Sequence, residues 1–138
     1  MDQRLIDSVK QHEGLRLRAY QDTAGVWTIG YGRNLQTLRI DAETAEQWLR
    51  EDLQAALEDA KRFPEFKYLD TQARRNVFVE MCFNLGATRL ALFTKMLAAI
   101  RKQDWERVAD EMLDSKWARD VKGRARTLAE IMRRGHYA

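Results

Sequence analysis

Apolar residues recur at helical spacing over most of this chain, and the spacing divides it into a series of helices. Near the N-terminus, Leu5, Ile6 and Val9 lie three or four residues apart, and Gly14 follows them. Residues at such intervals share one face of a helix, and glycine commonly ends one. The pattern predicts a short helix over residues 3–12.

A longer apolar stripe follows Asp41, whose side chain is a favourable N-cap. The stripe runs from Ala42 to Lys61 and consists of Ala45, Trp48, Leu49, Leu53, Ala56, Leu57 and Ala60. About twenty residues of helix span roughly 30 Å. The predicted helix is therefore long enough to connect two lobes of a small domain.

The most apolar segment is predicted to form the central helix of the core. Pro64 breaks the chain before this segment, Asp70 is expected to cap it, and it continues through Leu85 to a stop at Gly86. Further helices are predicted over about 89–102, over 104–114 with Asp104 as its cap, and over 123–134 with Gly135 as its end.

Residues 15–35 are the only part of the chain with a strand-like pattern. Apolar and charged residues alternate from Leu15 to Ala19, and the segment from Asp22 to Gly25 is typical of a turn. β-Branched and aromatic residues follow from Val26 to Ile29. The pattern predicts a small hairpin or three-stranded ribbon, so the fold class is α+β and mostly α.

The length of 138 residues, of which 45% are hydrophobic and 33% charged, is close to the usual size of one soluble domain. We expect a single domain over 1–138. Its predicted parts are a β-ribbon lobe over about 14–40, a connecting helix over about 42–61, and a helical lobe over about 65–138 that also includes the N-terminal helix 3–12.

The counts of cysteine and histidine exclude several kinds of site. One cysteine, Cys82, cannot form an intrachain disulfide, and with His12 and His136 it is too few for a common zinc ligand set. We therefore expect neither a metal nor a cofactor. No apolar run approaches the roughly 18 residues of a membrane span, and the N-terminus has no signal-peptide core, so we expect synthesis in the cytosol and no stable membrane insertion.

The net charge of +3 hides an uneven distribution. Residues 41–61 contain seven acidic and two basic residues, whereas residues 115–138 contain seven basic and two acidic ones. A basic end can attract nucleic acid, anionic lipid or an acidic wall polymer. A solvated helix face is the simpler explanation of the same charges, because charge runs usually form one.

Carboxylates are the best candidates for chemistry. Neither Ser8 nor Ser115 lies in a nucleophile elbow, and Cys82 is expected to be a buried thiol in the most apolar helix. Glu13 ends the first helix, and Asp22 lies in the next turn. Two carboxyl groups across a cleft can hydrolyse a glycosidic bond, although Asp22 could instead serve only to form an Asx-turn.

The segment from Glu13 to Gly32 carries a specific pattern, Glu-Gly-x-x-x-x-x-Tyr-x-Asp-x-x-Gly-x-x-Thr-Ile-Gly-x-Gly. It closely resembles the active-site segment of the phage-type lysozymes, the glycoside hydrolase family of bacteriophage endolysins. Similarity continues in the family's order over 42–53, Phe83 to Gly86, Ser115 to Trp117 and Gly123 to Arg126. The resemblance implies a lysozyme-like fold and hydrolysis of the β-1,4 bond between N-acetylmuramic acid and N-acetylglucosamine in peptidoglycan.

The resemblance also implies roles for individual residues. Glu13 would be the general acid, Asp22 the second carboxylate, and Thr28 a hydroxyl that helps to hold the attacking water. Candidate substrate-binding residues are Gly32, Phe83, Asn84 and Arg124. Arg124 resembles an arginine near the catalytic glutamate, with an ordinary surface arginine as the alternative, and for Phe83 the alternative is core packing.

The same resemblance implies peptidoglycan as the substrate, no nucleic-acid partner, a monomer, and a functional dependence on a holin. The protein would wait in the host cytoplasm until lysis and act in the periplasm. Arg33 stands where many members have histidine, and the segment 33–41 is short. Two other functions stay open, a lytic transglycosylase and a non-catalytic basic module that binds the wall.

Overall fold

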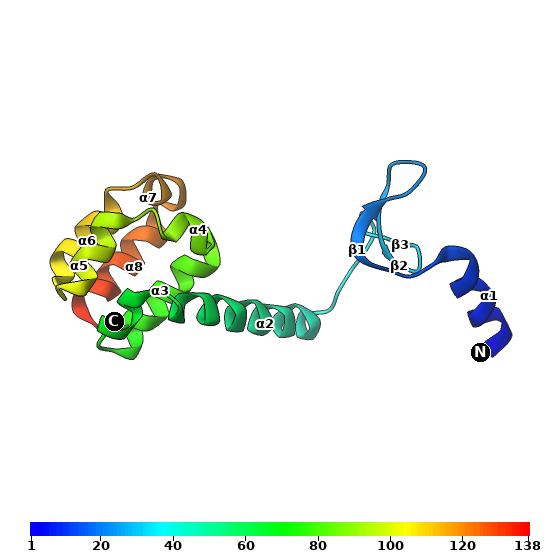
Figure 1. Cartoon of the computed structure of the whole chain (residues 1–138), viewed down its shortest axis with the longest axis horizontal. Coiled ribbons are helices and arrows are strands. Elements are labelled where there is room, and N and C mark those ends of the chain that lie inside the picture. Colours follow the sequence, from blue (N-terminus) through cyan, green and yellow to red (C-terminus); the bar gives the residue numbers. More distant parts are fainter. The chain divides into compact units, whose positions relative to one another are not determined.

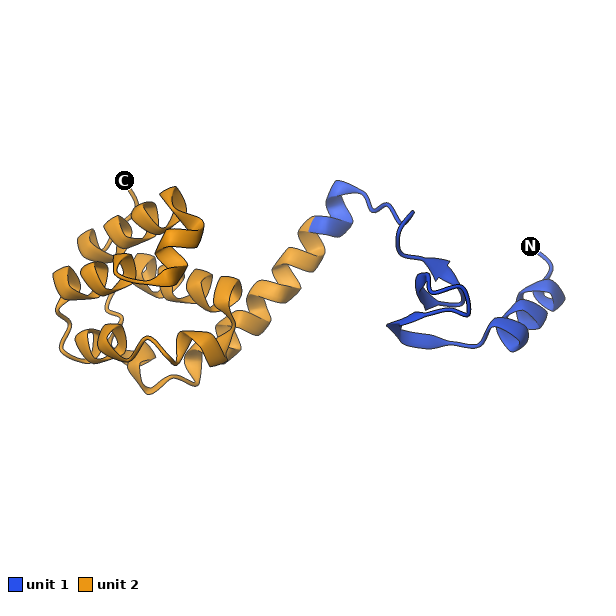
Figure 2. Cartoon of the chain, turned by 90° about the horizontal axis from the view of Figure 1, so that it is seen from above, with its two compact units in different colours: residues 1–45 blue, residues 46–138 orange.

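The computed structural model describes residues 1–138, which divide into two compact units, residues 1–45 and 46–138 (Figure 2). The structure is mostly helical and has one small antiparallel sheet, which confirms the predicted fold class (Figure 1). The prediction of one domain, with residues 3–12 in the helical lobe, stays a prediction.

The first unit contains one helix and the sheet. Helix α1 (Gln3–Glu13) begins after Asp2, whose side chain accepts a hydrogen bond from the N–H of Arg4 at 2.9 Å, and ends at Gly14 with φ 74°. The strands are β1 (Arg16–Gln21), β2 (Trp27–Gly30) and β3 (Arg33–Asn34), in that order across the sheet. The predicted three-stranded ribbon is confirmed, and β2 is its central strand.

Helix α2 (Ala42–Lys61) has the predicted bounds. Asp41 caps it as expected, because its Oδ1 accepts from the N–H of Thr44 at 2.7 Å. Only Ala56 and Ala60 of the predicted apolar stripe are buried.

Helix α3 (Gln72–Leu85) is the centre of the core of the second unit, as predicted. Its fully buried Phe78 lies edge-on to Phe63 at 5.3 Å and to Phe66 at 6.3 Å between ring centroids. Cys82 is 3% exposed, and burial raises the pKa of its thiol, in agreement with the inert thiol expected.

The predicted cap of α3 was wrong by one residue. Thr71 is the N-cap, since its hydroxyl accepts from the N–H of Arg74 at 3.1 Å. Asp70 instead accepts from the guanidinium of Arg74 at 2.9 Å. Both residue types can cap a helix, and the ion pair with Arg74 is the use that the fold makes of Asp70.

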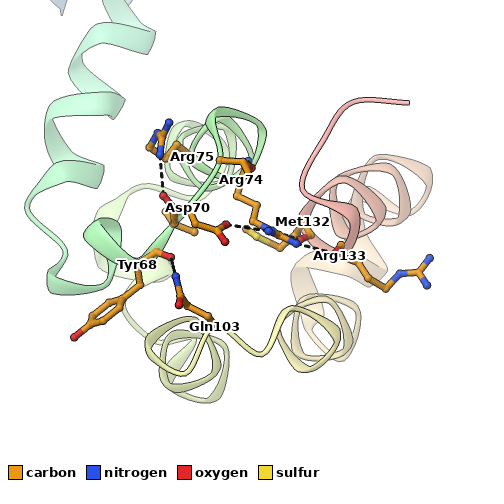
Figure 3. A network of polar contacts seen from close by, with 9 residues as sticks. Tyr68, Asp70, Arg74, Arg75, Gln103, Met132 and Arg133 are labelled. Atoms are coloured by element: carbon orange, nitrogen blue, oxygen red, sulfur yellow. Dashed lines mark hydrogen bonds and ion pairs between the residues drawn. The ribbon is translucent and has the colours of Figure 1, made fainter.

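Arg74 joins α3 to the end of α8 (Gly123–Arg134). It is only 7% exposed, and it donates to the carbonyl oxygens of Met132 at 2.8 Å and Arg133 at 2.9 Å (Figure 3). Its guanidinium also lies 4.2 Å from the centroid of the Trp105 ring. A buried arginine therefore satisfies carbonyl groups that the helix end leaves without partners.

The single helix predicted over 89–102 was wrong. The segment forms α4 (Ala87–Leu90) and α5 (Thr94–Arg101), and between them Leu92 and Phe93 donate to carbonyls three residues back. Leu92 is 75% exposed at this break. Neither glycine nor proline marks the position, so the sequence carried no local signal for it.

Two short helices were not predicted. Pro64 does end α2, but it also begins the 3₁₀ helix η1 (Pro64–Tyr68). Helix α7 (Lys116–Val121) is capped by Ser115, whose Oγ accepts from the N–H of Ala118 at 3.0 Å. Short helices of this kind give too few residues for a periodic pattern.

The other two helices agree with the prediction. Helix α6 (Trp105–Leu113) begins after its cap Asp104, and α8 ends at Gly135 with φ 84°. In the second unit α8 packs against both α3 and α6, and α5 packs against α6 (Figure 1). No helix of the structure has both the length and the apolar character needed to cross a membrane.

Lys122, between α7 and α8, has φ 47° and ψ −109°, a conformation suited to glycine. We expect Lys122→Gly to raise the free energy of unfolding by about 1 kcal/mol, because the strain it relieves exceeds the entropy that glycine adds to the unfolded chain. Gln103→Gly is the matched control. Gln103 also has positive φ, 53°, but its Nε2 donates to the Tyr68 carbonyl at 2.9 Å (Figure 3), so little net gain is expected. Chemical denaturation measures both, and equal gains would contradict this account.

The lowered pKa values of two carboxyl groups lead to a prediction of how stability depends on pH. Lys116 donates to Asp120 at 2.9 Å and lowers its pKa, and Arg133 beside Glu130 lowers that pKa in the same way. A group with a lower pKa in the folded state stabilises the fold above its unfolded pKa of about 4 and loses this effect as the pH falls through the folded value. The melting temperature should fall between about pH 5 and 3, and less steeply in an Asp120→Asn/Glu130→Gln variant. An unchanged slope would contradict the assignment.

Candidate functional site

Glu13 is the last residue of α1, and its carboxyl group lies against the turn between β2 and β3. A Cβ placed on Gly32 would be 3.1 Å from Glu13 Oε2 and 3.6 Å from Cδ. Gly32 also has φ +88°, which other residues adopt only with strain. The structure thus brings together two of the predicted site residues, Glu13 and Gly32. The backbone conformation favours glycine at position 32, and a methyl group there would press on the Glu13 carboxyl group.

Asp22 follows β1 and organises the tight turn that leads into β2. Its Oδ1 accepts from the backbone N–H groups of Ala24 and Val26, both at 2.9 Å. This is the turn-forming role that the sequence left open for Asp22. The second carboxyl oxygen, Oδ2, makes no hydrogen bond within the chain, so the turn occupies only half of the carboxylate.

Thr28 lies in the middle of the sheet, between Tyr20 of β1 and Asn34 of β3. It is 4% exposed, and its hydroxyl donates to the carbonyl of Val26 at 2.8 Å. The N–H of Val26 is the group that donates to Asp22. Asp22 and Thr28 are therefore both hydrogen-bonded to the backbone of Val26, in the same turn.

The donors and acceptors that remain limit what these side chains can do. A hydroxyl has one proton, and Thr28 uses it on Val26, so its oxygen can only accept from another group. Asp22 Oδ2 is likewise an acceptor when the carboxyl is ionised. A water molecule bound by both would donate its two protons to them and keep its lone pairs for another partner.

Phe83 and Arg124 line one cavity of the second unit, with a volume of about 880 Å³. Asn84 lines a different cavity of about 620 Å³, although it is the next residue after Phe83. Phe83 is 40% exposed and lies outside the buried core of the second unit, and its role stays a prediction. The structure does not bring Asn84 together with Phe83 and Arg124 in one cavity.

Two partners of these residues were not predicted. Arg124 Nε donates to Glu80 Oε2 at 3.0 Å, and Trp117 Nε1 donates to Asn84 Oδ1 at 2.7 Å. The members of each pair lie 44 and 33 residues apart, so no local spacing could have indicated them. The indole bond fixes the orientation of the Asn84 amide and leaves its NH₂ as the available donor.

Arg33 and the possible metal ligands are the remaining features of the candidate site. Arg33, on β3, forms no ion pair, so the charge that replaces the histidine of the resembled pattern has no carboxylate partner in its unit. No three His, Cys, Asp or Glu side chains gather as metal ligands. The segment from Glu13 to Gly32 offers two carboxyl groups, those of Glu13 and Asp22, and the buried hydroxyl of Thr28.

Comparison with known proteins gives consistent matches over almost the whole chain. The family model described as phage lysozyme matches residues 10–136. An endolysin of Acyrthosiphon pisum secondary endosymbiont phage 1 is 34% identical over 131 residues, which cover 91% of this chain and 86% of the relative. A probable T4-type lysozyme 1 of Dictyostelium discoideum is 24% identical over 94% of this chain and 93% of its own length. The endolysin of Salmonella phage P22 is 29% identical over 78% of this chain and 77% of its own length.

Proposed function

The chain belongs to the phage lysozyme family, and we propose that it hydrolyses the β-1,4 bond between N-acetylmuramic acid and N-acetylglucosamine in peptidoglycan. The observation that carries this proposal is the arrangement of Asp22 and Thr28 on the peptide groups of Val26. It offers a water molecule two acceptors and no donor. Such a water has its lone pairs directed away from the protein, as a nucleophile requires.

Glu13 is the acid of the proposed reaction. Its carboxyl group donates a proton to the glycosidic oxygen as the bond to the anomeric carbon breaks. The water held by Asp22 and Thr28 adds to that carbon and passes a proton to Asp22. This sequence of steps inverts the configuration at the anomeric carbon.

The stereochemistry of the product tests the proposal. NMR of freshly cleaved soluble peptidoglycan fragments should show the α-anomer first, because the β-linked substrate is inverted. A β-anomer would mean that Asp22 attacks the sugar itself and forms a covalent intermediate.

The other two functions predict different products. A lytic transglycosylase would release 1,6-anhydro sugars, which lack the added water, and mass spectrometry of digested wall distinguishes them. A non-catalytic module would bind the wall and release nothing.

Gly32→Ala should lower kcat by about tenfold, because the new methyl group displaces the Glu13 carboxyl and acids act over short distances. Gly30→Ala is the matched control. Gly30 also has positive φ, +72°, but a Cβ there meets nothing within 4 Å. Both variants should lose about 1 kcal/mol of stability, and only Gly32→Ala should lose activity. Equal losses of activity would assign the effect to backbone strain.

The proposal also includes further substrate-binding residues, the cell wall as a partner, and the site of action. Phe83, Asn84 and Arg124 are proposed to bind substrate, and the basic segment 115–138 to favour the polyanionic wall. Since two relatives are named endolysins, we also expect a monomer that waits in the host cytoplasm and reaches the periplasm through a holin.

A further inference from the structure

Few contacts fix the direction of α1 in the first unit. Within this unit none of its residues is buried, and a helix of 11 residues has little stability of its own. Gly14, with φ 74° and ψ 147°, joins α1 to β1 and allows the helix axis to turn. Because Glu13 is the last residue before this joint, the place of its carboxyl group depends on whatever holds the final turn of α1.

One side-chain contact joins the final turn of α1 to the turn between β2 and β3. The ammonium of Lys10 lies 5.7 Å from the centroid of the Tyr31 ring, a distance typical of a cation–π interaction. Lys10 belongs to the final turn of α1, where its carbonyl accepts from the N–H of Gly14 at 2.9 Å. Tyr31 directly precedes Gly32, the residue that Glu13 lies against. The contact therefore joins the turn that carries Glu13 to the turn that receives it.

We propose that Lys10 and Tyr31 are positioning residues for the reaction: their contact holds the end of α1 on the β2–β3 turn and so keeps the Glu13 carboxyl over Gly32. The inference rests on the proposed role of Glu13. Neither side chain takes part in bond making or breaking. Tyr31 is 42% exposed, so substitutions there leave the core intact.

Steady-state kinetics on soluble peptidoglycan fragments test the inference. Tyr31→Leu and Lys10→Met should each lower kcat about tenfold, with KM changed less than about twofold, because the acid is misplaced while the sugar still binds. Tyr31→Phe and Lys10→Arg should retain kcat, since each keeps a ring or a cation for the contact. The double variant Lys10→Met/Tyr31→Leu should be no slower than either single one, because both remove the same contact.

Lys67→Met is the matched control. Lys67 makes the same kind of contact with Tyr68, at 5.3 Å, in the second unit, and its loss should leave kcat unchanged. Assays run well below each variant's melting temperature separate a change of rate from a loss of folded protein.

Three results would overturn the inference. A raised KM in Tyr31→Leu with normal kcat would make Tyr31 a sugar contact, and multiplied losses in the double variant would mean that the two residues act separately. Normal kcat in both single variants would reduce the contact to a surface feature. Each is distinct from failure of the proposed function, which Glu13→Gln reports: if that variant is inactive and the Lys10 and Tyr31 variants are not, only the positioning role is wrong.

Discussion

Glu13→Gln is expected to lower kcat by a factor of about 10² to 10⁴, the usual contribution of a general acid. Glutamine has the same shape as glutamic acid and can remain against Gly32, but it has no proton to give to the glycosidic oxygen. Binding should persist, so the variant should sediment with isolated wall as the unchanged protein does. Turbidity of permeabilised Gram-negative cells measures lysis, and soluble fragments give kcat.

The substitution should not harm folding. Glu13 places a carboxyl group at the C-terminal end of α1, where the helix dipole disfavours negative charge, so its removal leaves the melting temperature unchanged or slightly higher. Asp7→Asn is the matched control, because it removes a carboxylate from the exposed face of the same helix. Full lysis by Glu13→Gln would refute the acid assignment, and a matching loss in Asp7→Asn would attribute the effect to α1 as a whole.

Local signals explain which elements were predictable. Gly14, Gly86 and Gly135 each end a helix with positive φ, and this requirement is visible in the sequence as a glycine after an apolar stripe. The bounds of α2 follow in the same way from Asp41 and the break at Pro64. No residue type marks the break between α4 and α5, and Leu90 and Met96 on its two sides are both buried.

The same distinction between local signals and long-range contacts applies to the candidate site. The pattern from Glu13 to Gly32 is short enough to be read as a unit, and the structure brings its two ends into contact. The turn role of Asp22 could be foreseen from the residue type, and the structure adds that one carboxyl oxygen remains unused. The contact of Arg124 with Glu80 joins two helices that are distant in the sequence, and only the fold could reveal it.

Arg74→Met should have the largest effect on stability, a loss of about 3 kcal/mol in the free energy of unfolding. The methionine fills much of the volume next to Trp105 but leaves the carbonyl groups of Met132 and Arg133 without donors (Figure 3). Buried acceptors without partners are costly, and Asp70 also loses its cation. The stability of Arg74→Lys should lie between that of Arg74→Met and that of the unchanged protein. A lysine ammonium lacks the planar set of N–H groups with which arginine donates to several acceptors at once.

A double-mutant cycle with Gly135 shows whether Arg74 acts at the end of α8. A Cβ on Gly135 would lie 2.8 Å from Arg74 Cζ and Nη1, so Gly135→Ala forces the guanidinium away in addition to straining a residue with φ +84°. In the Arg74→Met background only the strain remains, and Gly135→Ala should therefore cost less there than in the unchanged protein. Arg50→Met, which removes an exposed pair with Glu46 at 3.4 Å, should cost under about 1 kcal/mol. Additive losses for Arg74 and Gly135 would mean that the two residues stabilise the fold independently, and that Arg74 is not what holds the last turn of α8.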